Sequence, residues 1–149
     1  MKALFNTRDS IGLLIARITL GVVMFPHGAQ KVLGWFGGNG FSGTMGYFTQ
    51  NMGIPAVFAF LAIMAEFAGA LGLIFGAASR IAALGIGSTM LVAIFMGHSQ
   101  NGFFMNWMGN QAGEGFEYHL LAIGLSLIIM IEGAGKASID RMIASRLSR

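Results

Sequence analysis

Five ionisable side chains lie at the ends of long apolar segments, where they could meet at one level of the fold. His27 and Lys31 are one helical turn apart, His98 follows a later apolar segment, and Glu117 and His119 begin the last one. Imidazole, ammonium and carboxyl groups donate hydrogen bonds and transfer protons, so such a set could bind and protonate a polar ligand. We therefore treat these five residues as the candidate catalytic groups of a polar pocket.

Each of these side chains also has an ordinary explanation. Lys31 could extend its ammonium to a membrane surface, and a single histidine is usually a satisfied polar group. Histidine pairs can ligate a b-type haem, but the spacing carries no haem signature, so haem is not expected. The sequence shows no metal-ligand pattern and has no cysteine, which excludes disulfides and redox chemistry by its own thiols. Residues 133–138 faintly resemble a phosphate loop, but Ala137 follows the lysine and nucleotide binding is rejected.

Two further charged residues, Arg17 and Glu66, lie inside apolar segments. A charge near the centre of a membrane helix costs about 2.5–3.5 kcal/mol on insertion scales, so it usually faces a partner or a cavity. Counting about 1.5 Å per residue puts the two residues at heights that differ by about 5 Å in a hydrocarbon core of about 30 Å. We therefore predict a buried structural ion pair between Arg17 and Glu66.

Composition points to a membrane protein. The 149 residues are 55% hydrophobic and only 10% charged, too few charges for the surface of a soluble domain. The net charge of +3 could suggest a nucleic-acid partner, but the basic residues gather near the two ends of the chain and are better explained by membrane topology. We expect contact with a lipid bilayer and no nucleic acid.

Four apolar segments predict an all-α, polytopic four-helix bundle formed by a single domain, 1–149. The segments are 11–32, 55–78, 81–96 and 116–131, and each approaches the roughly 20 residues that span a bilayer. Lysine and arginine flank the ends and the short turn at Arg80, whereas loops 33–54 and 97–115 contain neither. This bias predicts that both termini are cytoplasmic.

The C-terminal region predicts a short amphipathic helix on the membrane surface, at about 138–148. Gly133 and Gly135 stop the preceding helix, and Ser138 can cap the next one. The following apolar residues fall at helical spacing, with arginines elsewhere on the wheel.

Motifs throughout the chain resemble those of a known family. In order they are Arg17-Ile18-Thr19-Leu20-Gly21, His27-Gly28-Ala29-Gln30-Lys31, Glu66-Phe67-Ala68-Gly69-Ala70-Leu71-Gly72-Leu73, Ser79-Arg80-Ile81-Ala82-Ala83, Glu117, and Gly133-Ala134-Gly135-Lys136-Ala137-Ser138-Ile139-Asp140. Together they resemble the DoxX family of small four-helix bacterial membrane proteins. Ala134 stands where the family commonly has proline.

The resemblance implies a multi-pass protein of the bacterial cytoplasmic membrane. Relatives include a subunit associated with thiosulfate:quinone oxidoreductase and proteins linked to membrane oxidoreductase complexes in oxidative or thiol stress. The cofactor stays unknown from the sequence, and the resemblance makes a quinone and a partner oxidoreductase subunit the candidates.

Three functions stay open. The first is a subunit of a quinone-linked oxidoreductase, with the polar pocket beside the loops 33–54 and 97–115, which are rich in aromatic residues. The second is a non-enzymatic scaffold or a module that holds a lipid or small ligand. The third is proton or solute transport, which four helices without an inverted repeat support less well unless a homo-oligomer builds the path.

Overall fold

The structure is a computed structural model that describes residues 2–147, and in this range it is helical without any β-strand. The long helices are α2 (Ile11–Leu33), α4 (Ala56–Phe75), α5 (Ser79–Ala93) and α6 (Glu117–Glu132). They coincide with the four predicted apolar segments. The shorter elements are α1 (Lys2–Phe5), η1 (Trp35–Gly37), α3 (Gly40–Gly46), η2 (Tyr47–Asn51), η3 (Ile94–His98), η4 (Ser99–Asn101) and α7 (Ile139–Leu147).

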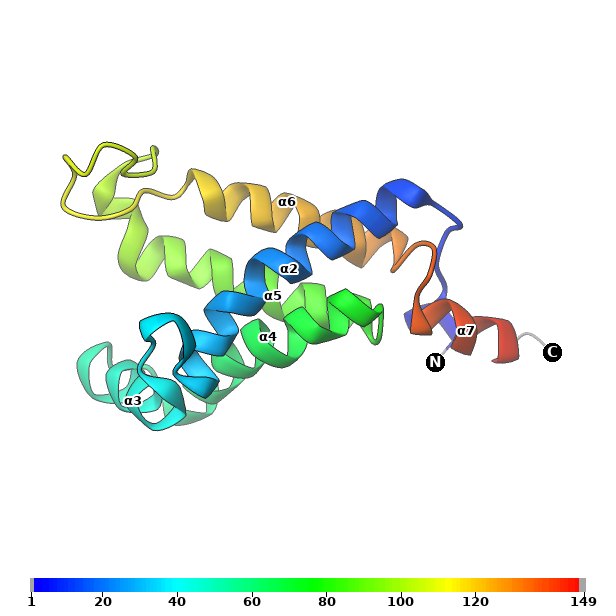
Figure 1. Cartoon of the computed structure of the whole chain (residues 1–149), viewed down its shortest axis with the longest axis horizontal. Coiled ribbons are helices and arrows are strands. Elements are labelled where there is room, and N and C mark those ends of the chain that lie inside the picture. The colour runs from blue at the N-terminus through cyan, green and yellow to red at the C-terminus, as the bar shows by residue number, and fades with distance from the viewer. Residues whose placement is uncertain (1, 148–149) are drawn as a thin grey trace.

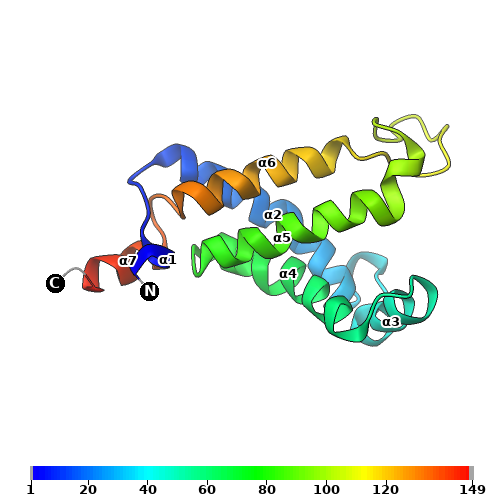
Figure 2. The ribbon, with the colours of Figure 1, turned by 180° about the vertical axis from the view of Figure 1, so that it is seen from behind.

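The long helices pack in a closed ring, because α2 contacts α4 and α6 while α5 contacts α4 and α6. Figures 1 and 2 show α2 crossing the other helices obliquely. Three helices in the described range are long and apolar enough to cross a membrane: α2, α4 and the continuous helix Ser79–Asn101. Helix α6 has 16 residues; that it also spans the bilayer stays a prediction.

Residue type explains the limits and the packing of α2. The Ser10 side chain accepts a hydrogen bond from the Leu13 amide at the start, and Gly34 ends the helix in the left-handed conformation. A Cβ on Gly28 would lie 2.5 Å from Cα of Phe67, so glycine is what lets α2 touch the backbone of α4. The buried face of α2, which also includes Met24, turns toward the bundle.

The two ends of the bundle differ. Figure 1 shows both termini and α7 at one end, and α3 with the long loop 102–116 at the other. We call the first the terminal end and the second the loop end. At the loop end, helix α5 continues through a π turn, η3, before the chain enters the loop.

At the terminal end, a completely buried Arg17 binds backbone carbonyls from two segments. Its guanidinium donates to the oxygens of Leu73 and Ile74 at 2.5 and 2.7 Å, and to three carbonyls of the segment that connects α6 to α7. Those three acceptors are Ala134 at 2.9 Å, Lys136 at 3.3 Å and Ala137 at 3.1 Å. Arg17 thus joins α2 to the end of α4 and to the chain that follows α6.

Helix α7 is fixed to the same end by Asp140, which is 2% exposed. Its carboxylate accepts from the amides of Ala78 and Ser79 at 2.7 and 2.8 Å, where α5 begins. Ser138 caps α7 as predicted, since its hydroxyl accepts from the Arg141 amide. Ile139, Met142 and Leu147 are exposed on α7, and that this helix lies on the membrane surface stays a prediction. Residues 148 and 149 of the predicted basic end lie outside the described residues.

Candidate functional site

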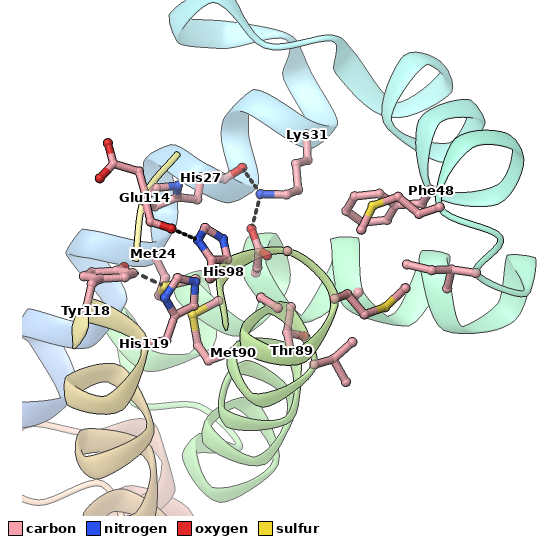
Figure 3. Close-up of a pocket in the computed structure, with 18 of the residues that line it drawn as sticks. Met24, His27, Lys31, Phe48, Thr89, Met90, His98, Glu114, Tyr118 and His119 are labelled. Atoms are coloured by element: carbon pink, nitrogen blue, oxygen red, sulfur yellow. Dashed lines mark hydrogen bonds and ion pairs between the residues drawn. The ribbon is translucent and has the colours of Figure 1, made fainter. Parts of the chain in front are cut away.

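A cavity of about 360 Å³ opens at the loop end of the bundle. It is bordered by α2, α4, α5 with η3, and α6, together with η2 and parts of both loops. Its lining is mostly apolar, with a small set of ionisable side chains among methionine and aromatic residues (Figure 3). The polar members are His27, Lys31, Glu66, Thr89, His98, Glu114, Tyr118 and His119.

One wall of the cavity carries an ion pair between Lys31 and Glu66. Lys31 Nζ lies 2.5 Å from Glu66 Oε2, and the side chains are 23% and 6% exposed. Lys31 Nζ also approaches the His27 carbonyl oxygen at 3.5 Å. The close contact of α2 with α4 at Gly28 brings Lys31 within reach of the carboxylate.

The predicted ion pair between Arg17 and Glu66 is therefore wrong. Arg17 reaches Leu73, about two helical turns or roughly 10 Å along α4 from Glu66. The carbonyls at the end of a helix have no intrahelical partner and carry partial negative charge, so they can satisfy a guanidinium without a carboxylate. Glu66 points inward as expected, but its partner is Lys31 and it lines the cavity.

The cavity lining also includes two histidines in contact, His98 from η3 and His119 from α6. Their ring centroids are 4.1 Å apart. His98 Nδ1 lies 2.8 Å from the backbone oxygen of Glu114. A carbonyl oxygen only accepts, so Nδ1 carries the proton and Nε2 of the neutral ring keeps its lone pair. His119 is 6% exposed, and within the described part of the chain its buried Nδ1 has no hydrogen-bond partner.

The structure brings four of the five candidate residues to the cavity. His27 lines it beside Tyr118, with ring centroids 6.2 Å apart. Glu117 is not among the lining residues. Its Oε1 accepts from the Met105 amide at 2.8 Å, so this carboxylate fixes the returning loop.

Sequence reasoning missed several cavity residues. Glu66 was assigned to the wrong partner, and Tyr118 was not considered although it precedes His119. The Tyr118 hydroxyl donates to Met24 Sδ at 3.3 Å, which connects α6 to α2. Five of the eleven methionines line the cavity, namely Met24, Met52, Met90, Met96 and Met105. No signal in the sequence separates these methionines from ordinary core residues.

Comparison with known proteins agrees with the fold. The DoxX family profile matches residues 12–99. The chain is 30% identical over 135 residues to "Inner membrane protein YqjF" of Escherichia coli (strain K12), covering 91% of this chain and 94% of that protein. It is 29% identical over 124 residues to "Putative oxidoreductase CatD" of Bacillus subtilis (strain 168), covering 83% and 82%. No solved structure was found to match.

Proposed function

The chain belongs to the DoxX family of membrane proteins, and from this premise we propose that it is the membrane subunit of a quinone-linked oxidoreductase. In this proposal the quinone head group enters the cavity at the loop end. The name of the Bacillus subtilis relative, "Putative oxidoreductase CatD", supports the reaction class.

The observation that carries the proposal is a mostly apolar cavity with an ammonium group on its wall. Ligand pockets commonly measure about 300–1,000 Å³ and combine apolar walls with a few converging polar groups. A quinone ring is a flat apolar body with two carbonyl acceptors. Phe48 and the methionines suit the ring, while Lys31 and His27 can donate to a carbonyl oxygen.

Quinone reduction to quinol consumes two electrons and two protons, and the residues of one wall can supply the protons. The ammonium of Lys31 is a proton donor, and Glu66 beside it can accept a proton from outside and return one to the lysine. The electrons come from a partner subunit or from a reduced substrate, because this chain has no cysteine thiols to supply them. Arg17, held by carbonyls at the terminal end, positions helices and takes no part in the proton transfers.

Quinone binding tests the proposal directly. The full-length protein in lipid nanodiscs should bind short-chain ubiquinone or menaquinone analogues. Lys31→Met should weaken this binding by about tenfold, the effect of one lost hydrogen bond to a charged group. Lys136→Met is the matched control, because Lys136 lies at the terminal end and pairs with Asp9 at 3.8 Å. No binding by the wild type, or equal effects of both variants, would count decisively against the proposal.

The scarcity of polar lining favours a second candidate, a non-enzymatic module that holds a lipid or another apolar ligand. Such a module needs the cavity but not Lys31 or His27. Extraction and mass spectrometry of co-purified lipid distinguish the two. A stoichiometric phospholipid that quinone analogues do not displace would favour the module.

We also propose that the protein resides in the bacterial cytoplasmic membrane with both termini in the cytoplasm. Arg8, Arg80, Lys136, Arg141 and Arg146 belong to segments of the terminal end, whereas Lys31 at the loop end is neutralised by Glu66. Since the chain has no cysteine, introduced ones report sidedness. A membrane-impermeant maleimide should label Gln111→Cys in intact cells and should not label Arg146→Cys.

A further inference from the structure

One group of side chains in the cavity lining has the composition of a site for a soft metal ion. His98 and His119 meet there, and Met24 and Met90 line the same space from α2 and α5. Figure 3 shows the side chains of both methionines directed toward the region of the His119 ring. Met24 and Met90, 1% and 5% exposed, belong to one buried cluster, so their sulfurs are held away from bulk water.

Both histidines have a ring nitrogen that is available to bind a metal ion. The bond from His98 Nδ1 to the Glu114 carbonyl fixes the ring and leaves Nε2 free, which is the arrangement by which metal-binding histidines are usually oriented. His119 presents a buried nitrogen without a partner in the described chain. A buried, unsatisfied polar atom is costly, and a bound ion would remove that cost.

The ligand types decide which metal fits. Within the described residues, no group of three or more His, Cys, Asp and Glu side chains could hold an ion. Thioethers are soft ligands that favour Cu(I), and imidazole also binds copper, whereas Mg²⁺, Ca²⁺ and Mn²⁺ prefer oxygen. An apolar pocket also suits a monovalent ion, which brings less uncompensated charge into a region of low dielectric constant.

We propose that His98, His119 and Met90, with Met24 as a further thioether, bind one Cu(I) ion. Two imidazole rings that bind one ion through bonds of about 2 Å must lie slightly farther apart than the His98 and His119 rings do here. Metal binding therefore moves these two rings apart. The inference does not depend on the quinone proposal, because its ligands do not include Lys31 or His27.

Competition with a chromophoric Cu(I) chelator tests the proposal on the full-length protein in detergent, with Ag(I) as a redox-inert substitute. The wild type should retain one equivalent of either ion. His98→Ala and His119→Ala should each weaken binding by at least about tenfold, and Met90→Leu, which conserves side-chain volume, should also weaken it. Met142→Leu on α7, where Met142 is 60% exposed, is the matched control and should bind like the wild type.

Two outcomes would overturn the assignment. The first is a wild type that holds Cu(I) no more tightly than a double variant lacking both histidines while both melt at the same temperature. The second is an X-ray absorption spectrum of the copper-loaded protein with nitrogen or oxygen neighbours and no sulfur. If a histidine variant does not fold, Met90→Leu and the spectrum still decide the question. Quinone binding can fail or succeed in the same preparations without changing either result.

Discussion

The two ends of this bundle bury charged side chains for different purposes. At the terminal end, Arg17 and Asp140 bind backbone groups: the arginine binds carbonyls, and the carboxylate binds amides at the start of α5. At the loop end, Lys31 and Glu66 bind each other beside a cavity, and His119 keeps a nitrogen without a partner among the described residues. Backbone partners cannot leave, whereas side chains on a cavity wall can exchange partners with a ligand.

The contrast shows that burial alone does not identify a functional charge. Arg17 is more completely buried than Glu66, yet its acceptors are all part of the fold. Glu66 is nearly as buried, but it lines a cavity in which a ligand could become its partner. Accessible volume beside the charged group is thus the better guide to function in this chain.

The largest effect is expected at the terminal end, from Arg17→Leu. The change leaves five carbonyl acceptors without the guanidinium, and each unsatisfied buried group costs about 1–3 kcal/mol. Because the carbonyls near helix α4 keep other partners, we expect a total loss of about 3 kcal/mol or more. Thermal unfolding in nanodiscs should show a much lower Tm than for Arg146→Leu, the control on exposed α7. Equal melting temperatures would mean that the carbonyl cluster is not structural.

Gly28→Ala should have the next largest effect, because it separates the helices that create the Lys31 and Glu66 contact. A Cβ would lie 2.5 Å from Phe67 Cα and 2.7 Å from the Glu66 backbone, which cannot move away cheaply. Overpacking of this kind costs about 1–3 kcal/mol. The matched control is Gly124→Ala, where nothing lies within 4 Å of the added Cβ. That control should be stabilised by about 0.5–1 kcal/mol, and similar melting curves for both variants would contradict the packing.

The helices could be predicted because the length and apolarity of segments determine them. The cap of α7 followed from Ser138, whereas Ser10 and Gly34, which limit α2 in the structure, were not singled out in the sequence. The partners of buried charges could not be predicted in this way. Helix depth put Arg17 within about 5 Å of the height of Glu66, whereas Arg17 contacts α4 at Leu73, roughly 10 Å from Glu66. Its backbone carbonyl partners do not appear in a pattern of residue types.

The site could be predicted only in part for a related reason. Helix depth correctly suggested that histidines from separate segments approach one another, and His98 lies against His119. Glu117 could not be placed, because its direction depends on the path of the 102–116 loop and on the Met105 amide. The methionine lining gives no sequence signal, since thioethers and core side chains share the same apolar pattern.

A smaller effect on stability is expected at the loop end, from Glu66→Gln. The amide has the same shape and can still accept from Lys31, and removing a buried charge lowers the desolvation cost. We expect a free energy of unfolding within about 1 kcal/mol of the wild type. Quinone binding should nevertheless weaken, because the neutral amide attracts the lysine ammonium less strongly than the carboxylate does and holds it in place less firmly. A variant that loses stability as strongly as Arg17→Leu would show that the two ends do not differ in the way described above.

The smallest effect concerns the surface contact between Asp9 and Arg141, which holds α7 from outside. The hydrogen bond from Arg141 lowers the pKa of the Asp9 carboxyl below its ordinary value of 3.8. The contribution of the Asp9 and Arg141 contact to the docking of α7 is therefore fully present above pH 3.8. It is lost as the pH falls through the lower pKa that Asp9 has in the folded protein. A fluorophore on α7, attached to Arg146→Cys, should report loosening of the helix only in that acidic range.

Two variants serve as controls. Asp9→Asn should show a slightly loosened helix already at neutral pH and no further loosening in the acidic range. Glu132→Gln, which removes the partner of Arg8 at the same end, should still show the acidic loosening. Because Asp140 of α7 is buried and binds the amides at the start of α5, complete release of the helix in Asp9→Asn would contradict the view that backbone contacts dominate at this end.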